Sequence, residues 1–331
     1  MRKVLPIVIA LAIAAPAVAA EKPADRAGAA VKRGLTFLTR DALDWKAGRG
    51  CATCHHAPMM IWTLSEARTL GYRINEEALA EVLTWVVDPE DKAKTYPPPR
   101  KPDAPKILSF SPLNHALAIG YARRDSDTVR AGWERFLDTL VADQHDDGAW
   151  RQGPGGRPPM NGEPGVMTAW TLLALTPPGK PELKDSVKAS RRKGLDWLAK
   201  TPIGDDFREE ALRLMLAARL GASGAEREAL ARRLAARQKA DGGWSQTKEL
   251  PGDAYATGLS LYALRSAGVA IEGAALTRGR EFLISSQRDD GSWPMASRPV
   301  GDYPPASDLR PITYAGSAWA TLGLMRSAAG E

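Results

Sequence analysis

The heptapeptide QKADGGW, residues 238–244, decides the fold of this chain because close copies of it occur at two other places. QHDDGAW occupies residues 144–150 and QRDDGSW occupies residues 287–293, each with Gln first, Asp three residues later, Gly four later and Trp six later. The first two copies start 94 residues apart and the last two start 49 apart. This spacing indicates a repeat of about 47 to 49 residues, with one unmarked unit between the first two copies.

Two classes of helical pattern surround the repeated heptapeptide. Stretches that precede a copy, or stand at the equivalent place, carry Lys and Arg on one side and Leu, Phe and Trp on the other, which is typical of outer helices. Stretches that follow are apolar and rich in Ala, Gly and Ser, which is typical of inner helices packed on both sides. The outer helices are predicted at 28–43, 75–88, 128–144, 184–201, 226–238 and 275–287, and the inner helices at 60–71, 115–124, 168–176, 209–221, 257–268 and 317–328. The sequence therefore predicts an all-α protein of six helix pairs.

The heptapeptide, standing between an outer and an inner helix, resembles the QW repeat of the squalene-hopene cyclase and prenyltransferase superfamily. The resemblance covers nearly the whole mature chain, strongly in three units and weakly in the others. It implies an (α/α)6 toroid, a closed ring in which the inner helices surround a central cavity. It also implies a structural role, tying neighbouring repeats together, for Gln144, Gln238, Gln287, Trp150, Trp244 and Trp293.

The catalytic pattern that the resemblance implies is absent. Cyclisation in that superfamily begins with protonation by a DxDD aspartate, and no DxDD occurs in this sequence. With 10 Trp, 7 Tyr and 5 Phe, several of them within the heptapeptides, we also expect a cavity lining poor in the aromatic rings that stabilise carbocations. The segment GDDFREE at 204–210 is faintly similar to a metal-diphosphate motif, but Asp205 and Asp206 equally suit the start of a helix. We therefore expect no terpene cyclase activity.

The beginning of the chain predicts export. Arg2 and Lys3 precede an apolar run that ends in small residues suited to cleavage after Ala19 or Ala20, so residues 1–20 are interpreted as a signal peptide. Residues 21–331 then form a single toroid domain in the periplasm or another exported location. No later segment has the length and apolarity of a membrane span. The formal net charge of +6 is scattered along the chain, so it predicts no nucleic-acid binding.

The motif that bears on function is CATCH within GRGCATCHHAPMM, residues 48–60, which contains both cysteines of the chain, Cys51 and Cys54, followed by His55. Cys-x-x-Cys-His is the attachment motif of c-type haem, in which two thiols bind the vinyl groups and the adjacent imidazole is the proximal iron ligand. Two other interpretations stay open. The cysteines can close a disulfide in an oxidising compartment, or they can bind zinc together with His55 and His115 as a Cys2His2 set.

The register of the inner helices suggests a second ligand. We expect one equivalent position near the start of each inner helix to line the mouth of the toroid, on the face where the long connections at 88–112, 151–165 and 294–311 gather. The residues at this position are Met60, His115, Thr168, Glu210, Thr257 and Ser317. His115 is thus the first candidate for the distal haem ligand, and the next candidates are His145, Met160 and Met167, with a five-coordinate iron as a further possibility.

The remaining residues around the motif have less prominent predicted roles. Met59 and Met60 are too close to His55 in sequence to reach round a porphyrin, and His56 is expected to cap or solvate the helix start. The predicted function is electron transfer or redox sensing by a haem-carrying toroid, with a redox partner protein. The alternatives are a cofactor-free toroid that binds a ligand or a partner and holds a disulfide, and a zinc-dependent toroid enzyme.

Overall fold

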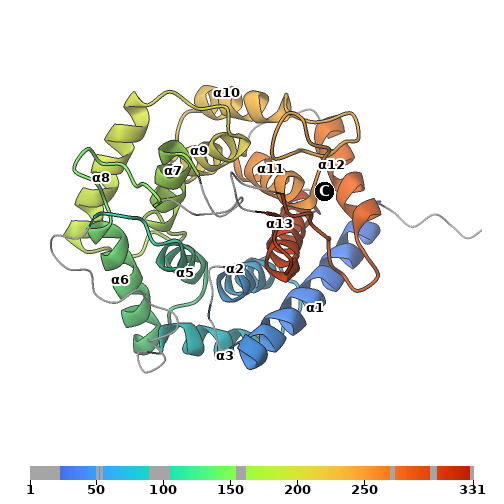
Figure 1. Cartoon of the computed structure of the whole chain (residues 1–331), viewed down its shortest axis with the longest axis horizontal. Helices are drawn as coiled ribbons and strands as arrows, with labels where there is room; N and C mark the ends of the chain where they lie inside the picture. Colours follow the sequence, from blue (N-terminus) through green and yellow to red (C-terminus); the bar gives the residue numbers. More distant parts are fainter. Residues whose placement is uncertain are drawn as a thin grey trace, which may run out of the picture.

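Two concentric rings of helices make up the protein (Figure 1). The structure is a computed structural model that describes residues 23–49, 52, 55–88, 105–153, 162–268, 273–298 and 304–328. These residues form twelve α-helices and no strand. None of the helices in the described ranges combines the length and the apolarity needed to cross a membrane. The predicted signal peptide and both cysteines of the CATCH motif lie outside the described residues.

The helices alternate along the chain between the outer and the inner ring, as predicted. The outer ring consists of α1 (Pro23–Arg49), α3 (Glu76–Val87), α6 (Asp127–Ala142), α8 (Asp185–Lys200), α10 (Gly224–Ala235) and α12 (Gly273–Ser286). The inner ring consists of α2 (His56–Thr69), α5 (Phe110–Tyr121), α7 (Pro164–Ala174), α9 (Phe207–Leu220), α11 (Ala254–Ser266) and α13 (Arg310–Ala328). The inner helices begin earlier than predicted, in part because their first turns contain prolines such as Pro164, which a first turn accepts.

The glutamine of each repeated heptapeptide forms a hydrogen bond to the next outer helix. Gln144 donates its side-chain amide to the carbonyl oxygen of Gly148 within the heptapeptide and to that of Ser190 on α8, both at 2.9 Å. The Ser190 hydroxyl returns a hydrogen bond of 2.8 Å to the other end of the same amide. Gln238 repeats the contact with Ala275 of α12 at 2.8 Å. Buried polar groups are thus satisfied by the neighbouring repeat, which fixes the two repeats relative to each other.

The tryptophan of the heptapeptide fills a gap that a glycine leaves on the same outer helix. Trp150 is fully buried, and a Cβ placed on Gly194 of α8 would lie 2.6 Å from its Cζ3 atom. Its indole nitrogen donates to the carbonyl oxygen of Leu140 at 2.7 Å, which fixes the ring. The other heptapeptides repeat the contact, with Trp244 against Gly279 and Trp293 against Gly34. The structural role predicted for the tryptophans is confirmed, whereas the glycines that face them were not predicted.

The last heptapeptide closes the ring. Gln287 donates to the carbonyl oxygen of Ala30 on α1 at 2.9 Å, and Trp293 packs against Gly34 of the same helix. The first and last repeats therefore meet through the same contacts that join neighbouring repeats. Since these two segments are far apart in sequence, the ring is closed by tertiary contacts rather than by chain connectivity.

One prediction about the inner ring is wrong. At three of the six helices, where the equivalent residue is Thr168, Thr257 or Ser317, this residue faces the outer layer rather than the mouth. Thr168 accepts a hydrogen bond from the backbone N–H of Trp150 at 3.1 Å, and Thr257 and Ser317 accept the matching bonds from Trp244 and Trp293. All three hydroxyls are fully buried between the rings, because they satisfy the backbone of the heptapeptide that precedes their helix.

Candidate functional site

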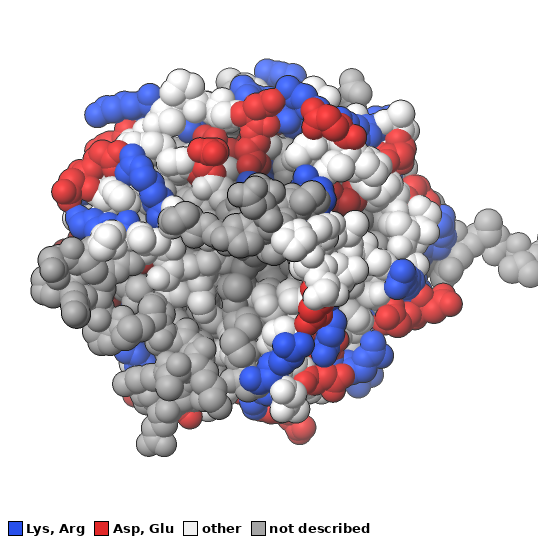
Figure 2. All heavy atoms as spheres, viewed as in Figure 1, with Lys and Arg blue, Asp and Glu red and all other residues white. Residues whose placement is uncertain are grey.

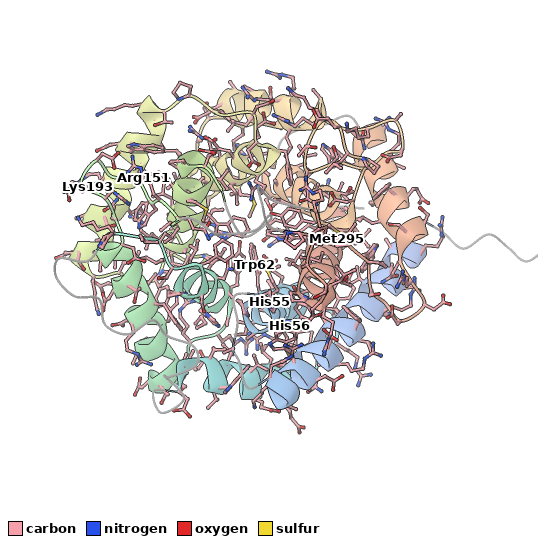
Figure 3. The ribbon with its side chains drawn as sticks, in the orientation of Figure 1. His55, His56, Trp62, Arg151, Lys193 and Met295 are labelled. Atoms are coloured by element: carbon pink, nitrogen blue, oxygen red, sulfur yellow. The ribbon has the colours of Figure 1, made fainter. Side chains whose placement is uncertain are left out.

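His55 and His56 mark the candidate site, at the start of α2 (Figure 3). His56 is 1% exposed and its ring stacks between two aromatic side chains, Trp45 of α1 at 4.2 Å and Tyr314 of α13 at 4.0 Å between ring centroids. Its Nε2 atom lies 3.0 Å from a carboxylate oxygen of Asp41 on α1. The prediction that His56 caps or solvates the helix start is therefore wrong, because packing of α1 and α13 against α2 encloses the ring.

A hydrogen-bonded chain leads from α13 to the CATCH motif. Arg310 donates to one carboxylate oxygen of Asp41 at 3.0 Å, and His56 contacts the other. The Nδ1 atom of His56 is in turn bonded to the Nδ1 atom of His55. The ring of His55 also meets the edge of Trp45, with 5.0 Å between centroids. The imidazole of the motif is thus oriented by residues of two other helices.

This series of hydrogen bonds determines which nitrogen of His55 carries the lone pair. Burial alone would raise the pKa of Asp41, but hydrogen bonds and charges from His56 and Arg310 bring that pKa below its usual value, so Asp41 is ionised at neutral pH. Burial lowers the pKa of His56 and lowers the pKa of His55 to about 3, so both rings are neutral. A neutral His56 that donates from Nε2 to Asp41 accepts at Nδ1. His55 therefore donates from Nδ1 and holds its lone pair on Nε2.

His115 lies in the interior of α5, fully buried. Its Nδ1 atom is 2.8 Å from the carbonyl oxygen of Ser111, and its ring stacks on Phe136 of α6 at 5.2 Å. Burial lowers the pKa of His115 to about 4, although the backbones of Ser111 and Ala52 offset part of that effect. Ala52 is close enough to influence the ring, but its carbonyl does not meet hydrogen-bond geometry, and Nε2 of His115 is left without a partner.

The structure places these sequence-predicted residues around one segment of chain. Because Ala52 stands between the two cysteines, His115 approaches the CATCH motif from the α5 side, while the contacts of His55 lie on the α1 side. Cys51 and Cys54 themselves lie outside the described residues, so neither the disulfide nor the proposed zinc set is tested. Within the described ranges, no group of three or more His, Cys, Asp or Glu side chains is arranged to hold a metal.

The other candidate distal ligands, Met160, Met167 and His145, lie in separate parts of the chain. Met167 is 1% exposed within α7, and Met59 and Met60 are buried in α2. His145 belongs to the first heptapeptide, where its backbone bonds to Ala149 and its buried Nε2 atom has no partner. Met160 lies outside the described residues.

Aromatic rings converge on the axis of the inner ring, which corrects the expectation of a lining poor in aromatics. Trp319 of α13 meets Trp62 of α2 at 5.0 Å and Trp170 of α7 at 6.3 Å between centroids. The indole nitrogens of Trp62 and Trp170 are buried and have no hydrogen-bond partner. The total number of aromatic residues did not predict this cluster, because the inner helices direct a large share of their aromatic side chains to the axis of the ring. The additional rings in this cluster are Phe110, Tyr121, Phe207, Tyr255 and Tyr262.

The acidic segment at 204–210 is structural, which agrees with its interpretation as the start of a helix. Asp206 accepts a hydrogen bond from the backbone N–H of Arg208 as the N-cap of α9. Asp205 pairs with Arg237 at 2.8 Å, and the fully buried Glu210 pairs with the same arginine at 2.7 Å. These carboxylates are committed to contacts within the protein, so this segment is not arranged to hold a metal-bound diphosphate.

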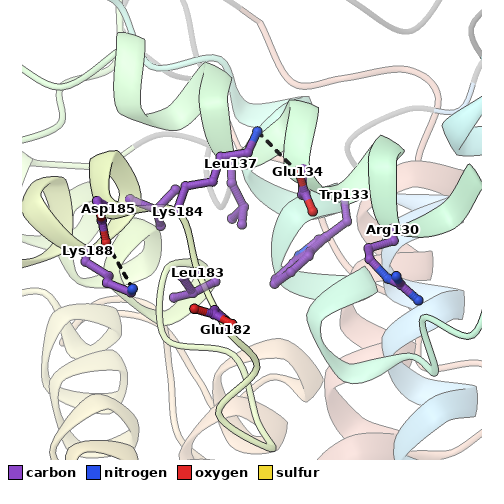
Figure 4. Close-up of a pocket in the computed structure, with 10 residues that line it drawn as sticks. Arg130, Trp133, Glu134, Leu137, Glu182, Leu183, Lys184, Asp185 and Lys188 are labelled. Atoms are coloured by element: carbon purple, nitrogen blue, oxygen red, sulfur yellow. Dashed lines mark hydrogen bonds and ion pairs between the residues drawn. The ribbon is translucent and has the colours of Figure 1, made fainter. Parts of the chain in front are cut away.

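A groove on the outside of the ring is a weaker candidate. It lies between α6 and α8 and has a volume of about 450 Å3 (Figure 4). Several of its charged side chains form ion pairs, since Lys184 lies 2.8 Å from Asp138 and 3.3 Å from Glu134, and Lys188 lies 3.1 Å from Asp185. All of these pairs are solvent-exposed, so the groove offers little unsatisfied chemistry to a ligand.

Comparison with known proteins agrees with this architecture. Residues 205–287 match the squalene-hopene cyclase N-terminal domain family. Comparison of the sequence with curated proteins gave no match. Among solved structures, a protein from Actinoplanes is similar with a TM-score of 0.58 at 18% identity, covering 91% of this chain and 99% of that chain.

Two other solved structures extend the likeness to enzymes of different chemistry. A variant of the type II terpene cyclase MstE from Scytonema, in complex with geranylgeranyl dihydroxybenzoate, is similar with a TM-score of 0.56 at 14% identity, covering 92% of this chain and 98% of that chain. A polysaccharide lyase is similar with a TM-score of 0.57 at 10% identity, covering 90% of this chain and 97% of that chain. The fold is an α/α toroid. At these identities the likeness establishes the toroid fold and no activity.

Proposed function

We propose that this α/α toroid is an exported protein that carries one c-type haem, covalently attached at the CATCH motif, and that it serves electron transfer or redox sensing. The observation that carries the proposal is the hydrogen-bonded chain from Asp41 through His56 to His55. It assigns the proton of His55 to Nδ1 and the lone pair to Nε2, the nitrogen that would ligate the iron. A metal-binding histidine is usually held in this way by a partner on its other nitrogen.

The residues present suit haem attachment. Cys51 and Cys54 have the two-residue spacing that matches the vinyl groups, and His55 follows directly as the proximal ligand. The bound group would supply a one-electron redox centre. The protein's own contribution is to orient His55 by means of His56 and to make its imidazole more electron-donating through the charge of Asp41.

His115 is proposed as the second axial ligand. Its Nδ1 atom is engaged by Ser111, its buried Nε2 atom has no partner, and the backbone of Ala52 within the motif is close to its ring. These are the features of an imidazole oriented for ligation. A bis-histidine haem is low-spin and has a lower reduction potential than a haem with methionine as one ligand.

The redox partner is proposed to bind the face on which the motif lies. On the face seen in Figure 2, described Lys, Arg, Asp and Glu side chains lie mainly around the rim, with both signs mixed. A rim of this kind favours a transient protein partner, because mixed charges orient the encounter without strong binding.

The test is a visible spectrum. The chain, produced in a bacterium able to mature c-type cytochromes, should show a reduced-minus-oxidised haem spectrum, and the haem should remain attached after denaturing electrophoresis. A double variant with Cys51→Ser and Cys54→Ser should lose the haem. His115→Ala should keep the covalent haem but change it from low-spin to high-spin and open it to carbon monoxide.

Three results would overturn these assignments. Zinc in stoichiometric amount by elemental analysis would assign the motif to a zinc site with His115. A mass two protons below that of the apo chain would assign it to a disulfide in a cofactor-free binding toroid. A His115→Ala spectrum identical to that of the wild type would remove His115 from the iron while leaving the attached haem in place.

A further inference from the structure

A cavity of about 300 Å3 lies between α11 and α12, which are neighbours in the inner and the outer ring (Figure 1). Ala254, the first residue of α11, and Ser286, the last residue of α12, both line it. The rest of its wall comes mainly from the segments that follow the second and third heptapeptides, within residues 246–253 and 294–298. The cavity therefore lies at the junction of two neighbouring repeats, on the face where the inner helices begin.

Three half-buried apolar side chains form the walls of this cavity. Phe282 of α12 packs its ring against the second heptapeptide, since a Cβ on Gly243 would lie 3.0 Å from that ring. Leu250 and Met295 line the cavity from the two loop segments. Side chains that are only half-buried still have apolar surface to remove from water, so these walls favour a ligand with an apolar body.

The equivalent place in the preceding repeat is charged. Phe282 stands five residues before Gln287, and the residue five before Gln238 is Arg233. Arg233 lines a groove of its own and is paired with the fully buried carboxylate of Glu210. The charged side chain of one repeat is thus replaced by an aromatic one in the next, which makes the cavity beside α12 apolar.

A series of hydrogen bonds forms the polar side of the cavity. The amide nitrogen of Gln246 donates to Asp253 at 3.1 Å, and its amide oxygen accepts from Nη2 of Arg298 at 2.8 Å. The other carboxylate oxygen of Asp253 accepts from the backbone N–H of Ala256 at 2.8 Å. Among the described residues, Gln246 is the only hydrogen-bond partner of the Arg298 side chain, whose guanidinium has five N–H donors. Arg298 is half-buried, so its remaining donors are accessible to a ligand in the cavity.

The charges around the cavity favour an anionic group beside Arg298. Arg298 and Asp253 are the only charged side chains that line it. The negative charge of Asp253 is offset by the positive end of α11, where this carboxylate is the N-cap. The C-terminal end of α12 would oppose an anion, but its carbonyl oxygens at Phe282 and Leu283 already accept hydrogen bonds from side chains, at 2.7 Å and 2.8 Å. Arg298 is therefore the charged group that is left to meet a ligand.

We propose that this cavity binds a small aromatic carboxylate. The carboxylate accepts hydrogen bonds from the free N–H groups of Arg298, whose planar guanidinium matches the two oxygens of such a group. The ring packs against Phe282 and Met295, since aromatic and thioether side chains both form favourable contacts with aromatic rings. The volume lies at the lower end of the range for small-molecule sites, which limits the ligand to about one ring. This site goes beyond the haem proposal and is independent of it, since it involves none of the residues around the CATCH motif.

The test is calorimetric titration of the full chain with sodium benzoate. Saturable binding to the wild type is expected. Two probes at the same ionic strength separate the contributions of the two halves of the ligand. Sodium acetate keeps the carboxylate without the ring, and benzylammonium chloride keeps the ring with the opposite charge. Both should bind more weakly than benzoate by about tenfold or more, because each loses one of the two kinds of contact.

Two variants locate the site. Arg298→Gln should weaken benzoate binding about tenfold or more, the effect of losing hydrogen bonds from a charged group. The matched control is Arg288→Gln, which removes an exposed arginine of the third heptapeptide that does not line the cavity, and it should bind benzoate like the wild type. Leu250→Asn makes the wall polar at nearly constant size and should weaken benzoate binding about fivefold or more. Far-UV circular dichroism checks that each variant is folded.

Several results would overturn the proposal. One is the absence of saturable benzoate binding to the folded wild-type chain. Another is acetate binding as tight as that of benzoate, which would remove the apolar walls from the site. A preference for benzylammonium would indicate a site for cations at Asp253. Equal benzoate affinity in Arg298→Gln and the wild type would place the binding elsewhere on the chain.

Discussion

Replacing Gly194 by alanine tests whether the repeated heptapeptide locks the ring by packing its tryptophan onto a glycine. A Cβ on Gly194 would lie 2.6 Å from Cζ3 of Trp150 and 3.0 Å from a methyl carbon of Leu172. Neither side chain has room to move, since Trp150 and Leu172 are fully buried and the indole is bonded to Leu140. The variant should therefore suffer the cost of an overpacked core.

The expected magnitude combines two opposing effects. Overpacking costs up to about 3 kcal/mol, while alanine in place of glycine within a helix returns about 1 kcal/mol. Gly194→Ala should thus lower the free energy of unfolding by about 2 kcal/mol. The matched control is Gly28→Ala in α1, where a Cβ would meet nothing within 4 Å. That variant should gain about 0.5–1 kcal/mol from the same chemical change.

The assay is urea unfolding followed by far-UV circular dichroism. A Gly194→Ala protein as stable as the Gly28→Ala protein would refute the locking contact. Trp150→Phe supplies a further check, because the smaller ring removes the Cζ3 atom that the new methyl would strike. In that background, Gly194→Ala should cost less than it does in the wild type, and strict additivity of the two substitutions would contradict direct contact.

Three further predictions test other parts of the protein. Trp244→Ala should cost about 3–5 kcal/mol, because a fully buried ring leaves a cavity, and an unchanged melting temperature would contradict this. In the haem-loaded protein, Asp41→Asn should raise the reduction potential, measured by redox titration, because His55 loses the anionic group that acts through His56. Burial raises the pKa of Asp253, so the folded state keeps its carboxyl protonated to a higher pH than the unfolded state does. Folding therefore becomes less favourable as the pH rises from the pKa of the unfolded state to that of the folded state. Asp253→Asn keeps a side-chain oxygen for the N-cap of α11, so its stability relative to the wild type should increase across this pH range in urea unfolding curves.

The sequence by itself determined the helical repeat. Helix periodicity and the fixed spacing of Gln, Gly and Trp are local properties, so both kinds of helix and the structural role of Trp150, Trp244 and Trp293 were predicted correctly. The CATCH motif could also be recognised locally, because the pattern on which the haem proposal rests occupies five consecutive residues.

Only the tertiary structure decided which residues meet across the ring. Asp41 and Tyr314 enclose His56 from opposite ends of the chain, and Glu66 pairs with Arg326 in the same way. No local pattern announces such partners, because their proximity arises from closure of the ring. The direction in which a helix residue points was likewise decided by the tertiary structure. The position of Thr168 was predicted to line the mouth, yet it faces the outer layer, since the backbone of the preceding heptapeptide requires a hydrogen-bond acceptor there.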